Sequence, residues 1–165
     1  MKRKIYITIS VFILLCTAIM LWYTIQTKYR NEHVYIAALP DCTLYKSNMY
    51  PYCISNTDKA IIVLYFLSDC QSCINELLEI SETEELFIKA QVYCVTTEPV
   101  EYLKEIETRF WLSQIIFLHD RDKFLLESLN VPKVPATYIF TADRTFIKRF
   151  IGFVSVNEII ANIRE

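Results

Sequence analysis

Residues 60–76 read AIIVLYFLSDCQSCINE, an unbroken apolar run followed by two cysteines three positions apart. An apolar run of strand length predicts a strand that is covered on both faces of a sheet. After the second cysteine, apolar residues recur at helical spacing. The stretch therefore predicts a strand, a short turn and a helix, with Cys70 and Cys73 where the helix begins.

The position of these two thiols favours redox chemistry. Unpaired amide N–H groups and the positive end of the helix dipole stabilise a thiolate at Cys70. Cys73, one turn further on, is placed to close a disulfide and release whatever Cys70 has attacked. In a chain with six cysteines, such a pair can also arise by chance or hold half of a zinc site. The strand before the motif favours the redox interpretation.

Residues 1–26 are expected to be a membrane anchor. Three basic residues precede residues 5–25, which run 21 positions without a charge and are long enough to cross a bilayer. The basic residues favour a cytoplasmic N-terminus, which would make this a single-pass protein of the bacterial inner membrane with its C-terminal domain in the periplasm or otherwise outside the membrane. A cleavable signal peptide is the alternative. A lipoprotein is disfavoured because Leu15 precedes Cys16 where a small residue is expected.

The charge balance of the remaining chain disfavours nucleic acid as a partner. Residues 1–26 hold three of the 17 basic residues and none of the 19 acidic ones, so residues 27–165 carry 14 basic against 19 acidic residues. An acidic surface repels phosphates. Gly152 is the only glycine, so the sequence has no phosphate-binding glycine loop, and we expect no organic cofactor.

The other cysteines allow structural interpretations. In an oxidising compartment, Cys42 and Cys53 could be bridged across residues 43–52, or they could be two independent thiols, and the sequence favours neither. Cys94 lies in a strand-like run and is expected to be a small core residue. Cys16 is expected to be an inert thiol within the membrane segment.

From residue 58 onward, strand and helix patterns alternate. After the first helix, which is expected to break near residues 81–84, strands are expected at 91–96, 114–118, 134–140 and 145–151. Helices are expected to begin near Pro99, Asp120 and Ser155. Residues 27–57 are expected to be a tether and extension with one or two short strands. The alternation predicts an α/β domain over residues 58–165, with a central mixed sheet flanked by helices.

Three separated features make the chain similar to the thioredoxin superfamily. They are the strand, cysteine pair and helix, the run VPKVPAT at residues 131–137, and Gly152 after the second strand of the terminal hairpin. The extra residues 115–130 resemble the insertion of membrane-anchored, extracytoplasmic thioredoxins of the TlpA type. The resemblance covers residues 58–165 and implies a thioredoxin-like fold.

The resemblance also implies roles for single residues. In this family the proline before the hairpin strand is cis and packs against the disulfide, and Pro135 stands there, although a plain strand-entry proline is the alternative. The backbone of Val134 would pair with a substrate peptide. TlpA-type proteins often carry an acid three positions after the second motif cysteine, where Glu76 stands. Glu76 would take or supply a proton at Cys73; its alternative is a solvated carboxylate that complements the helix dipole.

Departures from the family pattern bear on the redox balance. Asp69 replaces the tryptophan usual before the first cysteine, the proline often found between the cysteines is absent, and Leu64 stands where cytosolic thioredoxins bury an acid. A negative neighbour opposes formation of the Cys70 thiolate. The sequence therefore predicts a pair toward the reducing end of the family.

Together these features predict a membrane-anchored thiol-disulfide oxidoreductase that exchanges, and preferentially reduces, disulfides of client proteins. Cys70 would attack, Cys73 would resolve, and a membrane thiol-disulfide donor would supply electrons; an oxidase would instead need a quinone-linked partner. One alternative is a thioredoxin-fold module that binds or delivers copper through Cys70, Cys73 and His119. Another is a binding domain with a structural bridge. A peroxidase is disfavoured because Leu67 replaces the threonine of the Thr-x-x-Cys pattern.

Overall fold

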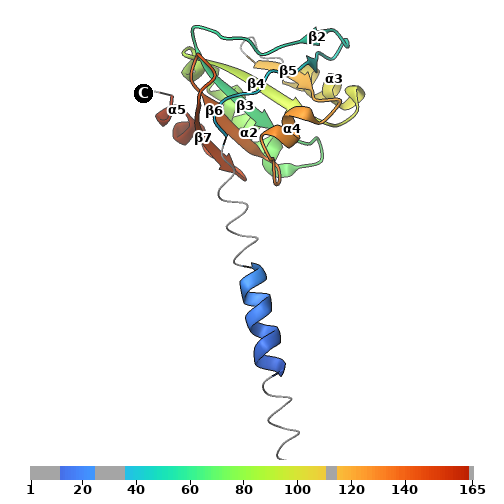
Figure 1. Cartoon of the computed structure of the whole chain (residues 1–165). Coiled ribbons are helices and arrows are strands. Elements are labelled where there is room, and N and C mark those ends of the chain that lie inside the picture. Colours follow the sequence, from blue (N-terminus) through green and yellow to red (C-terminus); the bar gives the residue numbers. More distant parts are fainter. Residues whose placement is uncertain (1–11, 25–35, 111–114, 164–165) are drawn as a thin grey trace, which may run out of the picture. The chain divides into compact units, whose positions relative to one another are not determined.

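The computed structural model describes residues 12–24, 36–110 and 115–163 (Figure 1). The chain divides into two compact units, Met1–Tyr35 and Ile36–Glu165. In the first unit, residues 12–24 are helical. No helix in the described ranges combines the length and the apolar character that crossing a membrane requires. Much of the predicted anchor, residues 1–11 and 25–26, lies outside these ranges, so the anchor stays a prediction.

The second unit is built on a seven-stranded sheet with the order β2-β1-β5-β4-β3-β6-β7 in the described part of the chain. Strands β3, β4 and β5 are parallel, whereas β1, β2, β6 and β7 each run antiparallel to the strands they pair with. The sheet is therefore mixed, as predicted. The strands are β1 (Leu44–Tyr45), β2 (Pro51–Tyr52), β3 (Ala60–Tyr65), β4 (Ala90–Thr96), β5 (Ile115–His119), β6 (Ala136–Phe140) and β7 (Phe146–Ile151).

Helices flank this sheet, as the alternating pattern predicted. They are α2 (Gln71–Glu82), α3 (Val100–Arg109), α4 (Phe124–Ser128), α5 (Val156–Ala161) and the short 3-10 helix η1 (Glu84–Phe87). One hydrophobic core joins alternate residues of β3, β4 and β5 to apolar residues of α2, α3 and α5. These three helices therefore cover the same face of the sheet.

The residues of β3 that point away from this core are buried as well. Ile61, Val63 and Tyr65 are at most 1% exposed. Leu125 and Leu129, in and just after α4, are also fully buried, and the Tyr138 hydroxyl in β6 donates a hydrogen bond to the Leu129 carbonyl at 3.2 Å. The second face is therefore covered too, which explains why β3 reads as a continuous apolar run.

Helix boundaries follow local capping, with two differences from the sequence pattern. At α5 the Ser155 side chain accepts the Glu158 N–H, as predicted. The predicted break after α2 is present, but the Ser81 hydroxyl donates back to the Leu78 carbonyl and does not cap η1. Asp120 lies further from its helix than expected, because α4 begins only at Phe124, but its carboxylate accepts the Leu125 and Leu126 N–H groups and so caps the helix as predicted.

Candidate functional site

Cys70 and Cys73 form a disulfide at the start of α2. Cys70 is the N-cap residue, and its Sγ accepts the Cys73 N–H at 3.2 Å. Cys73 is fully buried, whereas Cys70 is half-buried. The sulfur of Cys70 is therefore the one that a reacting partner can reach.

The segment around Pro135 lies at the same end of the sheet as the disulfide. The Val134–Pro135 peptide bond is cis. Ala136 pairs with Tyr65 at the end of β3, so the residues just before β6 and just after β3 share one edge. Val134 and Cys70 are both partly buried side chains that pack against the same hydrophobic core. The cis bond that the resemblance implied is therefore present, and the pairing of Val134 with a substrate stays a prediction.

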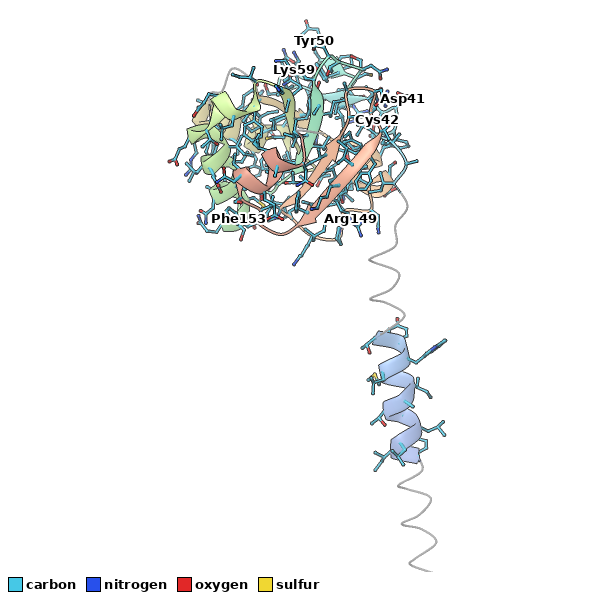
Figure 2. All side chains as sticks on the ribbon, turned by 90° about the vertical axis from the view of Figure 1, so that its left-hand side faces the viewer. Asp41, Cys42, Tyr50, Lys59, Arg149 and Phe153 are labelled. Carbon is cyan, nitrogen blue, oxygen red and sulfur yellow. A yellow bond between two sulfur atoms is a disulfide. The ribbon has the colours of Figure 1, made fainter. Side chains whose placement is uncertain are left out.

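Gly152 supports this segment from the end of β7. Its N–H donates to the Pro135 carbonyl at 2.8 Å. Its φ is +91°, a conformation that side-chain-bearing residues rarely adopt. The next residue, Phe153, is 52% exposed (Figure 2). A large apolar side chain is thus available to a partner close to the Pro135 segment.

Glu76 is buried without any exposed surface. The Thr137 hydroxyl donates to its Oε1 at 2.5 Å, and the Val154 N–H donates to its Oε2 at 3.4 Å. Burial raises the pKa of this carboxyl to about 7, although both hydrogen bonds act in the opposite direction. The alternative of a solvated carboxylate is therefore wrong. A carboxyl group with such a pKa can both hold and release a proton near neutral pH.

The remaining described cysteines of the second unit are free thiols. Cys94 is fully buried in β4, as predicted, and burial together with the nearby Glu76 carboxyl raises the pKa of its thiol. Cys42 and Cys53 line one surface hollow with Asp41 and Phe124. Burial and the charge of Asp120 raise the pKa of Cys42 to about 11, which keeps it protonated and unreactive. Figure 2 shows Cys42 well away from Phe153.

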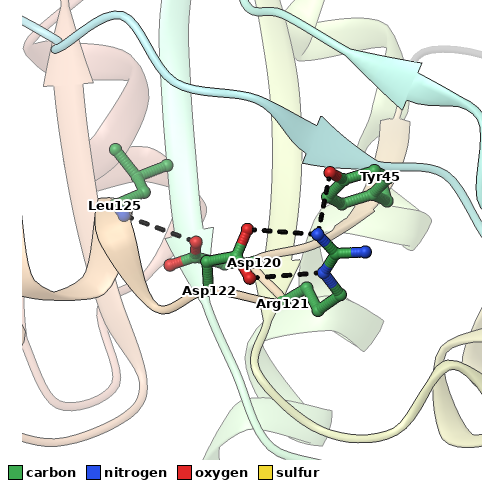
Figure 3. A network of polar contacts seen from close by, with 5 residues as sticks. All are labelled: Tyr45, Asp120, Arg121, Asp122 and Leu125. Carbon is green, nitrogen blue, oxygen red and sulfur yellow. Dashed lines mark hydrogen bonds and ion pairs between the residues drawn. The ribbon is translucent and has the colours of Figure 1, made fainter.

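A polar cluster at the end of β5 is structural (Figure 3). The buried carboxylate of Asp120 accepts the Tyr65 hydroxyl at 2.7 Å and the Leu126 N–H at 2.8 Å. Arg121 lies over the Tyr45 ring, 4.5 Å from its centroid, and donates to its hydroxyl at 3.2 Å. These contacts hold β1 and the start of α4 against β5.

His119, the copper-ligand candidate, lies at the end of β5. It is buried, and burial lowers its pKa. In the described residues its Nδ1 has no hydrogen-bond partner. No group of three or more His, Cys, Asp or Glu side chains is placed to hold a metal ion within the same ranges. Cys70, Cys73 and His119 are therefore not assembled into the ligand set that the copper alternative requires.

One contact next to the motif was not predicted from the sequence. Ser68, two residues before Cys70, hydrogen-bonds through its amide and its hydroxyl to the carboxylate of Glu98. The two residues are 30 positions apart and neither belongs to the motifs. The only sequence signal was that Ser68 and Glu98 each follow a predicted strand closely; the structure pairs these strands in parallel, so their carboxyl ends meet at one edge of the sheet.

Comparison with known proteins identifies the fold. No model of a protein family and no curated protein matches the chain. Among solved structures, a secreted disulfide oxidoreductase of Mycobacterium tuberculosis homologous to Escherichia coli DsbE is similar at TM-score 0.64 and 19% identity, over 74% of this chain and 93% of that one. The exposed lipoprotein thioredoxin of Streptococcus pneumoniae gives TM-score 0.65 and 18% identity, over 76% and 98%. The chain has a thioredoxin-like fold.

A peroxidoxin of Mycobacterium tuberculosis, BcpB, has the same fold at TM-score 0.70 and 14% identity, over 80% of this chain and 97% of that one. Proteins of different named activities therefore share this architecture. The likeness establishes the fold that the sequence resemblance implied, and the chemistry must be argued from the site.

Proposed function

We propose that the chain is an extracytoplasmic thiol-disulfide oxidoreductase of the TlpA type, anchored in the bacterial inner membrane, that reduces disulfides of client proteins. The observation that carries the proposal is the Cys70–Cys73 disulfide at the start of α2, with one sulfur accessible and one buried. An accessible attacking sulfur and a protected resolving sulfur are what a two-step exchange requires.

In the reduced protein, the Cys70 thiolate attacks one sulfur of the client disulfide. The client S–S bond breaks, a Cys70–client bond forms, and one client thiolate leaves. The Cys73 thiolate then attacks Cys70, the mixed disulfide breaks, and the second client thiolate leaves. Two electrons pass from the pair to the client, and the Cys70–Cys73 disulfide remains.

Glu76 would serve the second step as proton acceptor for Cys73. It stands three residues after Cys73 on α2, and residues at this spacing lie on one face of a helix. Its raised pKa of about 7 suits a group that must take a proton from a thiol and return it near neutrality. Thr137 and Val154 hold its two oxygens and fix their direction.

Val134 and Pro135 would receive the client. Extended peptides bind proteins by adding a strand to exposed backbone, and Val134 is half-buried just ahead of β6. Exposed Phe153 would add an apolar contact near this backbone. No organic cofactor and no metal enters the scheme.

Electrons would come from a thiol-disulfide donor in the membrane, because an oxidising compartment does not reduce the pair. A membrane anchor in residues 1–26 would keep the domain close to such a donor. The names of two similar structures, a secreted oxidoreductase and an exposed lipoprotein, support a location outside the cytoplasm.

Trapping of the mixed disulfide tests the proposal. The full chain with Cys73→Ser, reduced and mixed with insulin whose disulfides are intact, is expected to accumulate a covalent adduct through Cys70. The wild type is expected to reduce the insulin disulfides catalytically, with dithiothreitol as the reductant. Cys70→Ser is the matched control and is expected to give neither adduct nor turnover. Equal adducts from both variants, or no turnover by the wild type, would contradict the proposal.

A further inference from the structure

The turn that carries Cys70 is tethered to the neighbouring strand by one side chain, Glu98. Its Oε2 accepts the Ser68 backbone N–H at 2.6 Å, and its Oε1 accepts the Ser68 hydroxyl at 2.8 Å. Ser68, two positions before Cys70, therefore hydrogen-bonds to both carboxylate oxygens of Glu98. Hydrogen bonds to an ionised acceptor are shorter and stronger than those between neutral groups.

Glu98 is itself anchored to the end of β4. Its backbone N–H donates to the Thr96 hydroxyl at 3.2 Å, and the same hydroxyl lies 3.5 Å from Oε2. Thr96 is the last residue of β4 and is buried. The carboxylate is therefore held in place, unlike a freely moving surface side chain.

The contact extends the attachment of β3 to β4 beyond their ladder. The parallel pairing ends at Tyr65 and Val95, and the Phe66 N–H still donates to the Val95 carbonyl at 3.1 Å. Ser68 lies past this point, and its N–H goes to Glu98. The Cys70 N–H then closes the turn onto the Leu67 carbonyl at 3.3 Å. The place of Cys70 relative to β4 thus depends on the Ser68–Glu98 contact.

We propose that Glu98 is a positioning residue for the thiol-disulfide exchange: it holds the turn before Cys70, and its charge disfavours the Cys70 thiolate, which makes the pair more reducing. The inference rests on the proposed function, because it assigns a role within that reaction. A negative charge near a thiol destabilises the thiolate, and a destabilised reduced form shifts the couple toward the disulfide. Asp69, exposed beside Cys70, adds to the same local charge.

The proposal that Glu98 positions Cys70 is tested by the rate at which the reduced full chain forms a mixed disulfide with insulin whose disulfides are intact. In the Cys73→Ser background, Glu98→Ala is expected to slow this step roughly tenfold, because misplacement of an attacking group is costly. Glu98→Gln keeps a carbonyl oxygen for the Ser68 N–H and is expected to restore most of the rate. Circular dichroism and the melting temperature report whether each variant is folded.

The charge part is tested by the equilibrium of the Cys70–Cys73 pair with glutathione. Glu98→Gln is expected to shift this equilibrium about threefold toward the dithiol, the effect of removing one partly screened charge. Glu101→Gln is the matched control: it removes an exposed carboxylate in the first turn of α3 and is expected to leave the equilibrium unchanged.

The outcomes separate this inference from the proposed function. A wild-type rate in Glu98→Ala, or equal shifts in Glu98→Gln and Glu101→Gln, would overturn the role of Glu98 while leaving the exchange reaction intact. A wild-type chain with no reversible couple would overturn the proposed function and, with it, this inference.

Discussion

Glu76 combines complete burial with an ionisable carboxyl group, and this combination affects both stability and catalysis. The folded state raises its pKa from the ordinary value of 4.5 to about 7, so folding favours the protonated form. Stability from this group is therefore fully present below pH 4.5 and is lost as the pH rises toward and through 7. The loss amounts to about 3 kcal/mol for a shift of this size.

Replacing Glu76 by Gln is expected to abolish this loss. The free energy of unfolding, measured by urea titration, should exceed that of the wild type at pH 8 by about 1–3 kcal/mol, and the difference should vanish below pH 4.5. Glu82→Gln is the control, because Glu82 is exposed at the end of the same helix. Equal pH profiles for the wild type and Glu76→Gln would show that the carboxyl titrates normally.

The same variant is expected to slow the resolving step. If Glu76 accepts the Cys73 proton, Glu76→Gln should lower the rate of client release by roughly 100-fold, the size of effect usual for a proton-transfer group. The rise in rate with pH near 7 should disappear as well. Single-turnover release of reduced insulin from the mixed disulfide measures both. An unchanged pH profile would leave Glu76 with a purely structural role.

At the scale of elements, the stability of α5, which packs beside α2, depends on its N-terminal cap. Ser155 accepts the Glu158 N–H at the start of α5, and α5 shares the hydrophobic core with α2. Ser155→Ala is expected to lower the free energy of unfolding by about 1 kcal/mol. Ser128→Ala, at an exposed position of α4, is the control and should change it by less than about 0.5 kcal/mol. Urea titration compares them.

A second element contact joins the β6–β7 turn to the N-terminal segment of the domain. The Arg144 guanidinium donates to the Leu39 carbonyl at 2.7 Å and to the Asp41 carboxylate at 2.5 Å. Arg144→Ala is expected to destabilise the domain by about 1–2 kcal/mol, chiefly by leaving the Leu39 carbonyl without this donor. Lys104→Ala, exposed on α3, should have little effect. A matching loss in Asp41→Ala would show instead that the exposed ion pair dominates.

The sequence predicted correctly the strands and helices whose formation depends on residues close together in the chain. The apolar run at β3, the helical spacing in α2 and the Ser155 cap were all legible because each depends on neighbours in sequence. The two-residue strands β1 and β2 were foreseen only in outline, because β1 is defined by its pairing with distant β5 and β2 by its pairing with β1.

Only those site residues that belong to a recognisable motif could be predicted from the sequence. The cysteine pair and Pro135 carry their positions in the sequence, but the burial of Glu76 depends on Thr137 and Val154, which are 61 and 78 positions away. The Ser68–Glu98 contact and the buried, unsatisfied Nδ1 of His119 likewise arise from packing between distant strands. Polar residues of this kind look like solvated surface in a sequence.

At the scale of the whole molecule, residues 1–26 are predicted to keep the domain at the membrane. Expressed in a bacterium, the full chain is expected to stay in the membrane pellet after carbonate extraction and to retain Met1 by mass spectrometry. A protein that starts near residue 27 would instead identify a cleaved signal peptide and contradict the anchor.

The reduction potential of the Cys70–Cys73 pair in the full chain tests the central claim most directly. Equilibrated against glutathione and thioredoxin buffers, the pair is expected to lie near or below roughly −270 mV, the value of a reducing thioredoxin. A potential near −120 mV would make the protein an oxidant. The absence of any reversible dithiol couple would contradict a redox role altogether.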